Sequence, residues 1–116
     1  MYKFLIVILT MLLVTISCTK EIAPPQNYDC NSVDRTYLTG IKTIIDTKCA
    51  ISGCHVGTFT SGSFETYSIL YNKYTSGALE FRLFTFPTMP PANQTQLTQK
   101  ELTQFRCWID QGAPNN

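Results

Sequence analysis

Apolar residues recur at helical spacing along much of the chain. In residues 33–48 they are separated by steps of three and four, with polar residues between them. This spacing predicts an amphipathic helix. Gly40 lies inside the stretch, where it either weakens the helix or marks a close approach by another helix. The apolar positions are Val33, Tyr37, Ile41, Ile44 and Ile45.

Two further stretches carry the same signal. The series Phe64, Tyr67, Leu70, Tyr71 and Tyr74 predicts a helix after a polar loop, with Gly77 as its stop. Residues 78–86 also contain several apolar residues, but their periodicity fits a short helix and an extended segment equally well.

The last predicted helix has a clear start and end. Thr98 and Glu101 form a capping box, in which each side chain satisfies the other residue's free amide. Gly112 and then Pro114 end the helix. Its apolar positions are Leu102, Phe105, Trp108 and Ile109. The pattern as a whole predicts an all-α domain without internal repeats.

The N-terminus has the features of an export signal. Lys3 precedes an apolar run over residues 4–14, which is shorter than the roughly 20 residues of a transmembrane helix. The run ends in Ser17-Cys18, and small residues before a cysteine resemble the lipobox of bacterial lipoproteins. We therefore expect a signal peptide over 1–17, a lipidated Cys18 with a tether over 18–32, and one domain over 33–116. The alternative is ordinary cleavage without lipidation of Cys18.

Charge excludes some partners. Without residues 1–17 the chain has 99 residues, with eight basic and eight acidic side chains and no basic run. This balance argues against nucleic acid and against charge-driven binding to an anionic membrane. Membrane attachment would then depend on the lipid alone. A domain of this size often needs a cross-link or a cofactor for stability.

The main candidate for chemistry is the run from Cys49 to His55. A Cys-x-x-Cys-His motif is typical of covalent c-type haem attachment, in which both thiols bond to the haem and the histidine ligates its iron. Here four residues separate Cys49 from Cys54, and Ser52-Gly53 can supply the extra bend. The alternatives are a Cys49–Cys54 disulfide, which an oxidising compartment allows, and a zinc site, which usually needs four protein ligands.

Met89 is the candidate for the second axial ligand. After loss of residues 1–17, His55 and Met89 are the only histidine and the only methionine in the chain. Met89 lies in Phe86-Pro87-Thr88-Met89-Pro90-Pro91, which is stiff because proline fixes φ. His/Met ligation raises the reduction potential of a haem. The alternatives are a core methionine and a weak polyproline recognition segment.

These motifs together resemble the small mono-haem cytochrome c domains of bacterial lipoproteins. The resemblance rests on Ile44-Ile45, Cys49 to His55, Met89-Pro90-Pro91, and Leu97-Thr98 followed by Glu101 and Trp108-Ile109…Gly112-Ala113. It implies a class I cytochrome c-like fold of three to four helices around one covalently bound haem c. Cys49 and Cys54 would form the thioethers, His55 the proximal iron bond and Met89 the distal bond.

The resemblance also implies how the helices meet. The first and last helices would cross near Phe105 or Trp108, which would bring Cys30 and Cys107 together in a structural disulfide. Such a bond closes a long loop and contributes about 4 kcal/mol in the chain-entropy model. We expect the following aromatic residues in the core, where they can also form the wall of a haem pocket. They are Tyr67, Tyr71, Tyr74, Phe81, Phe84 and Phe86.

The function expected from these features is single-electron transfer by a cytochrome c in the bacterial cell envelope, as a periplasmic or outer-membrane lipoprotein. It would not be an enzyme by itself, and its partners would be transient redox proteins. One alternative is a haem-free, disulfide-stapled lipoprotein that binds another envelope protein. Another keeps the haem but leaves Met89 unbound, which opens a site for a gas or peroxide.

Overall fold

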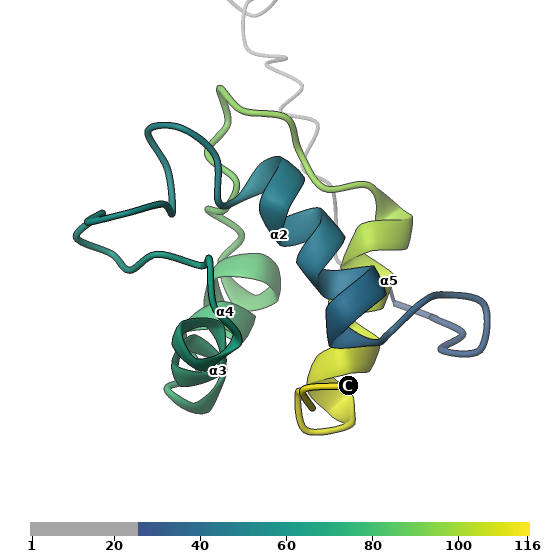
Figure 1. The fold of residues 1–116 in the computed structure, drawn as a ribbon. Helices are drawn as coiled ribbons and strands as arrows, with labels where there is room; N and C mark the ends of the chain where they lie inside the picture. The colour runs from purple at the N-terminus through teal and green to yellow at the C-terminus, as the bar shows by residue number, and fades with distance from the viewer. Residues whose placement is uncertain (1–25) are drawn as a thin grey trace, which may run out of the picture.

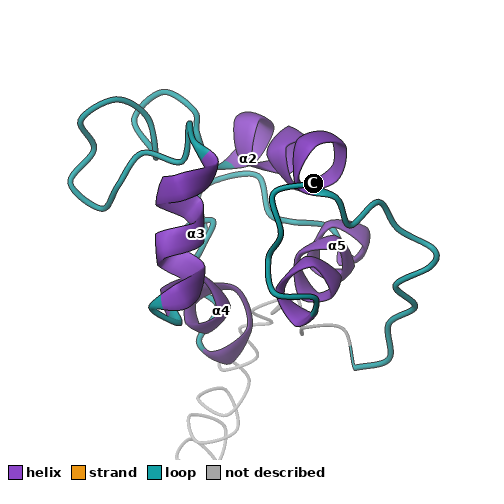
Figure 2. Ribbon diagram, turned by 60° about the horizontal axis from the view of Figure 1, so that its bottom comes forward, coloured by secondary structure: helices purple, strands orange, loops and turns teal. Residues whose placement is uncertain are grey.

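A computed structural model describes residues 26–116, and this part of the chain contains helices and loops but no strand (Figures 1 and 2). The all-α prediction is confirmed. The predicted signal peptide, Cys18 and the first part of the tether lie outside the described residues. In chain order the segments are η1 (Tyr37–Ile41), α2 (Lys42–Lys48), α3 (Tyr67–Thr75), α4 (Ala78–Glu80), η2 (Phe81–Thr85) and α5 (Gln99–Asp110), where η marks a π-helix.

The first helix is a continuous rod in which η1 runs directly into α2. It begins at Tyr37 and not at Val33, because Asp34 forms a turn ahead of it. The Asp34 carboxylate accepts hydrogen bonds from the backbone N–H and the hydroxyl of Thr36, at 3.0 and 2.7 Å. Thr36 is extended and forms the N-cap. A carboxylate that bonds the backbone two residues later competes with helix formation.

Gly40 is buried in this rod, and the contact that requires a glycine is local. A Cβ atom at Gly40 would collide with the backbone carbonyl of Asp34. The close approach is therefore made by the turn before the helix, and not by another helix as the sequence suggested.

The middle of the chain forms two helices joined at Gly77. The α3 helix begins at Tyr67, three residues later than Phe64, because Thr66 is still extended. Gly77 ends the α3 turn in the left-handed region, with φ of 74°, which confirms it as a stop. The segment whose periodicity was ambiguous is helical, since α4 and η2 together span Ala78–Thr85.

The α5 helix follows the sequence prediction closely. Both bonds of the capping box are present between Thr98 and Glu101, and Gly112 follows the helix with a positive φ. Its buried face packs on η1, and the Tyr37 and Trp108 rings lie 6.1 Å apart. Figures 1 and 2 show the first rod against α5, with α3 and α4 beside them. The side chains with least exposure are Trp108, Phe105, Ile41, Ile45, Leu70 and Cys107.

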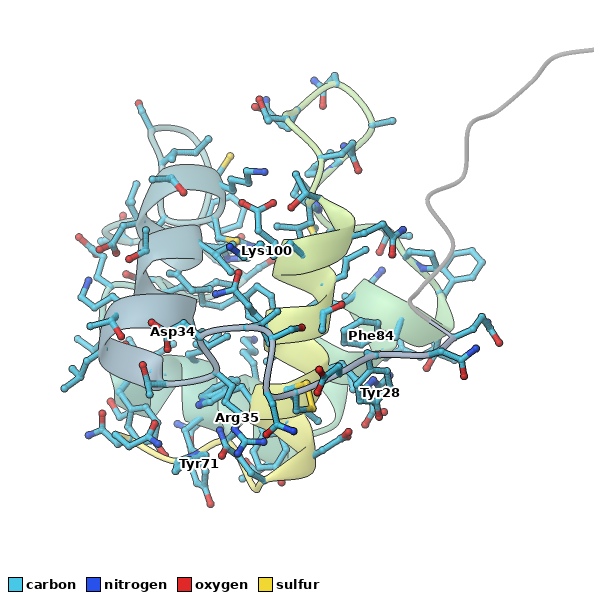
Figure 3. The ribbon with its side chains drawn as sticks, turned by 90° about the vertical axis from the view of Figure 1, so that its right-hand side faces the viewer. Tyr28, Asp34, Arg35, Tyr71, Phe84 and Lys100 are labelled. Carbon is cyan, nitrogen blue, oxygen red and sulfur yellow. A yellow bond between two sulfur atoms is a disulfide. The ribbon has the colours of Figure 1, made fainter. Side chains whose placement is uncertain are left out.

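The predicted Cys30–Cys107 disulfide is present and ties the start of the described chain to α5. Tyr28 reinforces this connection, because its hydroxyl donates to a carboxylate oxygen of Asp110 at 2.6 Å. In Figure 3 Tyr28 lies on the face of α5 that carries the disulfide. This side of the molecule is thus held by both a covalent bond and a packed core.

Candidate functional site

The four predicted haem-site residues line one cavity of about 440 Å³. Two loops enclose it, and Figure 1 shows both loops at the C-terminal end of α2. We name them the His loop, residues 49–66, and the Met loop, residues 86–97. Cys49, Cys54 and His55 come from the first loop, and Met89 comes from the second. Residues 40 positions apart in the sequence thus face the same space.

The four residues between the two cysteines form a loop that is closed by a backbone hydrogen bond. The backbone N–H of His55 donates to the carbonyl of Cys49 at 2.9 Å, which closes the base of the intervening loop. Gly53 has φ of 80°, as expected for the residue that supplies the bend. The residues of the longer spacing therefore form a loop that is narrow at its base, which we call the pinched loop, and the backbone of His55 lies next to that of Cys49.

The two cysteines of this loop are free thiols, so they do not form the alternative disulfide. Cys49 also packs against the hydrophobic core at the end of α2. Burial, and secondly the neighbouring Cys54, raise the pKa of the Cys49 thiol to about 11. Cys49 is therefore a protonated thiol at neutral pH.

The imidazole of His55 is held in one orientation by two kinds of contact. Its Nδ1 lies 2.8 Å from the carbonyl oxygen of Gly62. Its ring stacks on Phe64 at a centroid distance of 3.9 Å, and Phe59 meets it edge-on at 5.1 Å. A carbonyl can only accept, so the proton of the neutral ring is on Nδ1 and Nε2 keeps its lone pair. His55 is thereby prepared to bind an electron-pair acceptor through Nε2.

The Met loop is held by contacts to its backbone. The N–H groups of Thr88 and Met89 donate to the carbonyl of Arg82, at 3.0 and 3.4 Å. The side-chain amide of Gln96 donates to the carbonyls of Pro90, Pro91 and Gln94, at 3.3, 2.8 and 2.9 Å.

The Met89 side chain is itself 38% exposed and is not part of the buried core. A methionine that fills a gap in the core would be buried. The structure therefore disfavours a packing role for Met89.

The walls of the cavity are apolar, and its charged groups are all cationic. The apolar lining includes Ile45, Leu79 and Leu83, and the aromatic lining is Phe59, Phe64 and Phe105. The charged lining residues are Lys48, Lys73 and Arg82, without any Asp or Glu.

Of these three cations, only Lys48 forms an ion pair with another residue of the described chain. Lys48 forms an ion pair with Glu101 at 2.6 Å and donates to the carbonyl of Gln96 at 2.9 Å. Lys73 and Arg82 form no ion pair with another residue of the described chain.

The six aromatic residues expected in the core and pocket wall are placed differently. None of them lines the cavity. Phe84 is buried and three tyrosines are partly buried against the core, but Phe81 and Phe86 are 46% and 61% exposed. Helical spacing could not distinguish the buried aromatic residues from the exposed ones, because it does not show which element packs against each face of a helix.

Several residues that shape the site carried no sequence signal. Gly62 and Phe64 fix the ring of His55, while Arg82 and Gln96 fix the Met loop. Their contacts lie within the irregular loops or at their junction with η2, where helical periodicity gives no signal.

Other features of the described chain do not suggest a second site. A more open depression of about 650 Å³ near Tyr28 and Lys100 contains none of the predicted site residues. Within residues 26–116, no three His, Cys, Asp or Glu side chains gather into a group that could hold a metal ion. None of the helices described here has the length and apolar character needed to span a membrane.

Comparisons with protein-family models, with curated proteins and with solved structures found no match for this chain.

Proposed function

We propose that this protein is a lipid-anchored, extracytoplasmic c-type cytochrome with a single haem, which carries single electrons between redox partners. The observation that carries the proposal is the convergence of Cys49, Cys54, His55 and Met89 on one cavity. Two thiols, an imidazole and a thioether are the groups that attach and ligate a haem c.

The cavity suits a group of this kind. Its volume of about 440 Å³ lies within the roughly 300–1,000 Å³ of small-molecule sites in proteins. Its walls are mostly apolar, as a porphyrin requires, and each of the two enclosing loops supplies a donor. The class I cytochrome c-like arrangement of the helices is part of this proposal.

The two thiols would hold the group covalently. Each thioether would form by addition of a thiol across a haem vinyl group, with the sulfur on one vinyl carbon and the thiol hydrogen on the other. Cys49 is fixed at the end of α2 by its N–H bond to Ile45 at 2.9 Å, whereas Cys54 lies in the pinched loop. The longer loop gives Cys54 the reach to a second attachment point.

The axial positions would be taken by His55 and Met89. The hydrogen bond between His55 Nδ1 and the Gly62 carbonyl orients the ring and makes Nε2 a stronger donor. The Met89 thioether, held on a loop that is tied down through its backbone, would complete the ligand set and favour a high reduction potential. When bound, the haem supplies one-electron exchange between ferric and ferrous iron.

The compartment proposed for the protein agrees with its covalent structure. The Cys30–Cys107 disulfide is typical of proteins that fold in an oxidising environment. The sequence features of residues 1–18 also indicate export, with the lipid on Cys18 as the anchor.

The test is attachment of haem to the full chain in a host with cytochrome c maturation. We expect the denatured protein to keep a mass increase of one haem, with the pyridine haemochrome spectrum of two thioethers. Cys49→Ala and Cys54→Ala should each change that spectrum to the type with a single thioether. Ser52→Ala, in the same loop, is the matched control. A colourless protein whose mass is that of chain and lipid alone would refute the proposal.

Distal ligation is tested by Met89→Ala. The variant should keep its covalent haem but lose the six-coordinate low-spin spectrum, while Asn93→Ala in the same loop leaves it unchanged. A low-spin spectrum that persists in Met89→Ala would exclude Met89 as the ligand. A wild-type protein that already lacks this spectrum would favour the open site for a gas or peroxide.

The second candidate function is the haem-free, disulfide-stapled lipoprotein that binds another envelope protein. The observation in its favour is the Cys30–Cys107 disulfide, which ties the segment before η1 to α5 independently of any cofactor. A colourless but folded and fully disulfide-bonded protein would make this the better account.

A further inference from the structure

The cationic lining of the cavity points to the chemistry of its ligand beyond the ring and the iron. Lys73 is partly buried and Arg82 is exposed, so both can reach a ligand in the cavity, and a cation forms a stronger hydrogen bond to a carboxylate than to a neutral acceptor. Lys48 already has such a partner in Glu101, but Lys73 and Arg82 have none among the described residues. The cavity therefore has two positive charges to offer to a ligand.

Lys73 lies on the side of the His loop. Its Cε would be 3.3 Å from a Cβ placed on Gly62, the residue whose carbonyl meets His55 Nδ1. The Lys73 ammonium makes no hydrogen bond within the described chain, so its three donors are available. Gly62 has φ of 97°, and the missing side chain leaves room for the lysine stem.

Arg82 occupies the side of the Met loop and is already oriented there. Its guanidinium donates to the hydroxyl of Thr88 at 3.1 Å and lies 5.8 Å from the centre of the Phe81 ring. Its backbone carbonyl also accepts from Met89. One of its five N–H donors is used, and the remaining four can bind a carboxylate in the bidentate manner that guanidinium favours.

We infer that Lys73 and Arg82 are the binding residues for two carboxylate groups of the ligand, so that the site selects a planar apolar molecule with two acidic groups. A tetrapyrrole dicarboxylate belongs to this class. The inference rests on the proposed function for the identity of the ring, but not on iron ligation or thioether formation.

The experiment compares two probes on the full chain purified without haem. Mesoporphyrin IX has both carboxylates but neither iron nor vinyl groups, and its dimethyl ester carries two uncharged methyl esters in their place. Porphyrin fluorescence gives the dissociation constant of each. We expect the wild-type chain to bind the diacid about tenfold or more tightly than the ester, as charge-assisted hydrogen bonds to two carboxylates imply.

Variants then assign the preference to the two residues. Lys73→Gln and Arg82→Gln should each reduce the ratio of ester to diacid dissociation constants, and the double variant should bring it close to one. Lys73→Arg, which keeps the charge, should retain the preference. Lys100→Gln and Arg35→Gln remove the same charges outside the cavity and serve as matched controls.

Equal binding of the two probes by the wild-type chain, or a preference that persists in the double variant, would overturn the inference. If the chain nevertheless acquires covalent haem in a maturation host, the proposed function stands and only the carboxylate assignment fails. If neither probe binds and no haem is attached, both fail.

Discussion

The two sides of this molecule are built in different ways. On one side, the first helical rod and α5 pack through fully buried side chains, and the Cys30–Cys107 disulfide ties the segment before the rod to α5. On the other side, the His loop and the Met loop enclose a cavity and are held mainly by single hydrogen bonds. The first side contributes most of the stabilising contacts of the fold, and the second carries the residues of the candidate site. Stability and ligand chemistry should therefore respond to different mutations.

The largest effect on stability should follow removal of the disulfide. Its two cysteines are 77 residues apart, so the chain-entropy model predicts that Cys30→Ala with Cys107→Ala lowers the free energy of unfolding by about 4 kcal/mol. Denaturant unfolding of the full chain measures this loss, and the reference is the wild-type protein with its disulfide intact. The spectrum of the proposed haem should be the same in the folded variant as in the wild type. A loss of both stability and spectrum would show that the two sides are coupled.

Gly40→Ala should have the next largest effect on the free energy of unfolding. It should destabilise the protein, whereas Gly→Ala stabilises most helix positions. Alanine normally stabilises a helix relative to glycine, by about 0.5–1 kcal/mol. Here the new Cβ meets the backbone carbonyl of Asp34, so the turn or the helix must shift. We expect a loss of about 1–3 kcal/mol, typical of an overpacked core.

The same denaturant unfolding measures this loss. Thr43→Ala, at an exposed position of the same rod, is the control and should remain within about 0.5 kcal/mol of wild type. A Gly40→Ala variant as stable as this control would mean that the Asp34 turn adjusts freely.

Gln96→Ala tests how the Met loop, on the cavity side of the molecule, is held. It removes the amide that donates to Pro90, Pro91 and Gln94, but Gln96 is exposed and water can replace part of the loss. Global stability should fall by no more than about 1 kcal/mol. The local effect should be clear, with faster amide hydrogen exchange in residues 86–97.

The matched control for this variant is Asn93→Ala in the same loop, for which we expect wild-type exchange. If Gln96→Ala leaves exchange in the Met loop unchanged, the side-chain amide is not what holds the loop.

The smallest predicted effect concerns the ion pair that connects the two sides. Burial acts to raise the pKa of Glu101, but hydrogen bonds from Lys48 and Thr98 and the charge of Lys48 outweigh it, so the net pKa is lowered. A lowered pKa in the folded state stabilises the protein above the pKa of the unfolded carboxyl. This stability is lost as the pH falls through the folded pKa.

Unfolding free energies measured at neutral pH and at successively lower acidic pH test this linkage. Acidification should destabilise the wild type more than Glu101→Gln, because the variant has no carboxylate to protonate. Asp34 and Glu65 also have lowered pKa values, and their contribution remains in both proteins. Identical acid sensitivity of the two proteins would mean that the Lys48–Glu101 pair does not stabilise the fold.

Sequence reasoning succeeded where short-range interactions decide the structure. Helical spacing, the Thr98–Glu101 capping box and the stop at Gly77 all act within a few residues, so their signals are contained in the local sequence. Helix starts were less accurate, since the Asp34 turn replaced the expected first turn of the first helix. The exposure of Phe81 and Phe86 was also missed, because a periodic pattern does not identify what packs on each face.

What the sequence determined by itself is most of the helical content, the stop at Gly77, the capping box of α5 and the set of residue types for the candidate site. Only the tertiary structure decided that Cys49, Cys54, His55 and Met89 meet at one cavity, that Gly62 and Phe64 orient the imidazole, and that Lys73 and Arg82 face the same space. The physical reason is the range of the interactions. Helix periodicity and caps depend on neighbours three or four positions away. The cavity forms where two irregular loops meet helices that are positioned by long-range packing, such as that of η1 on α5.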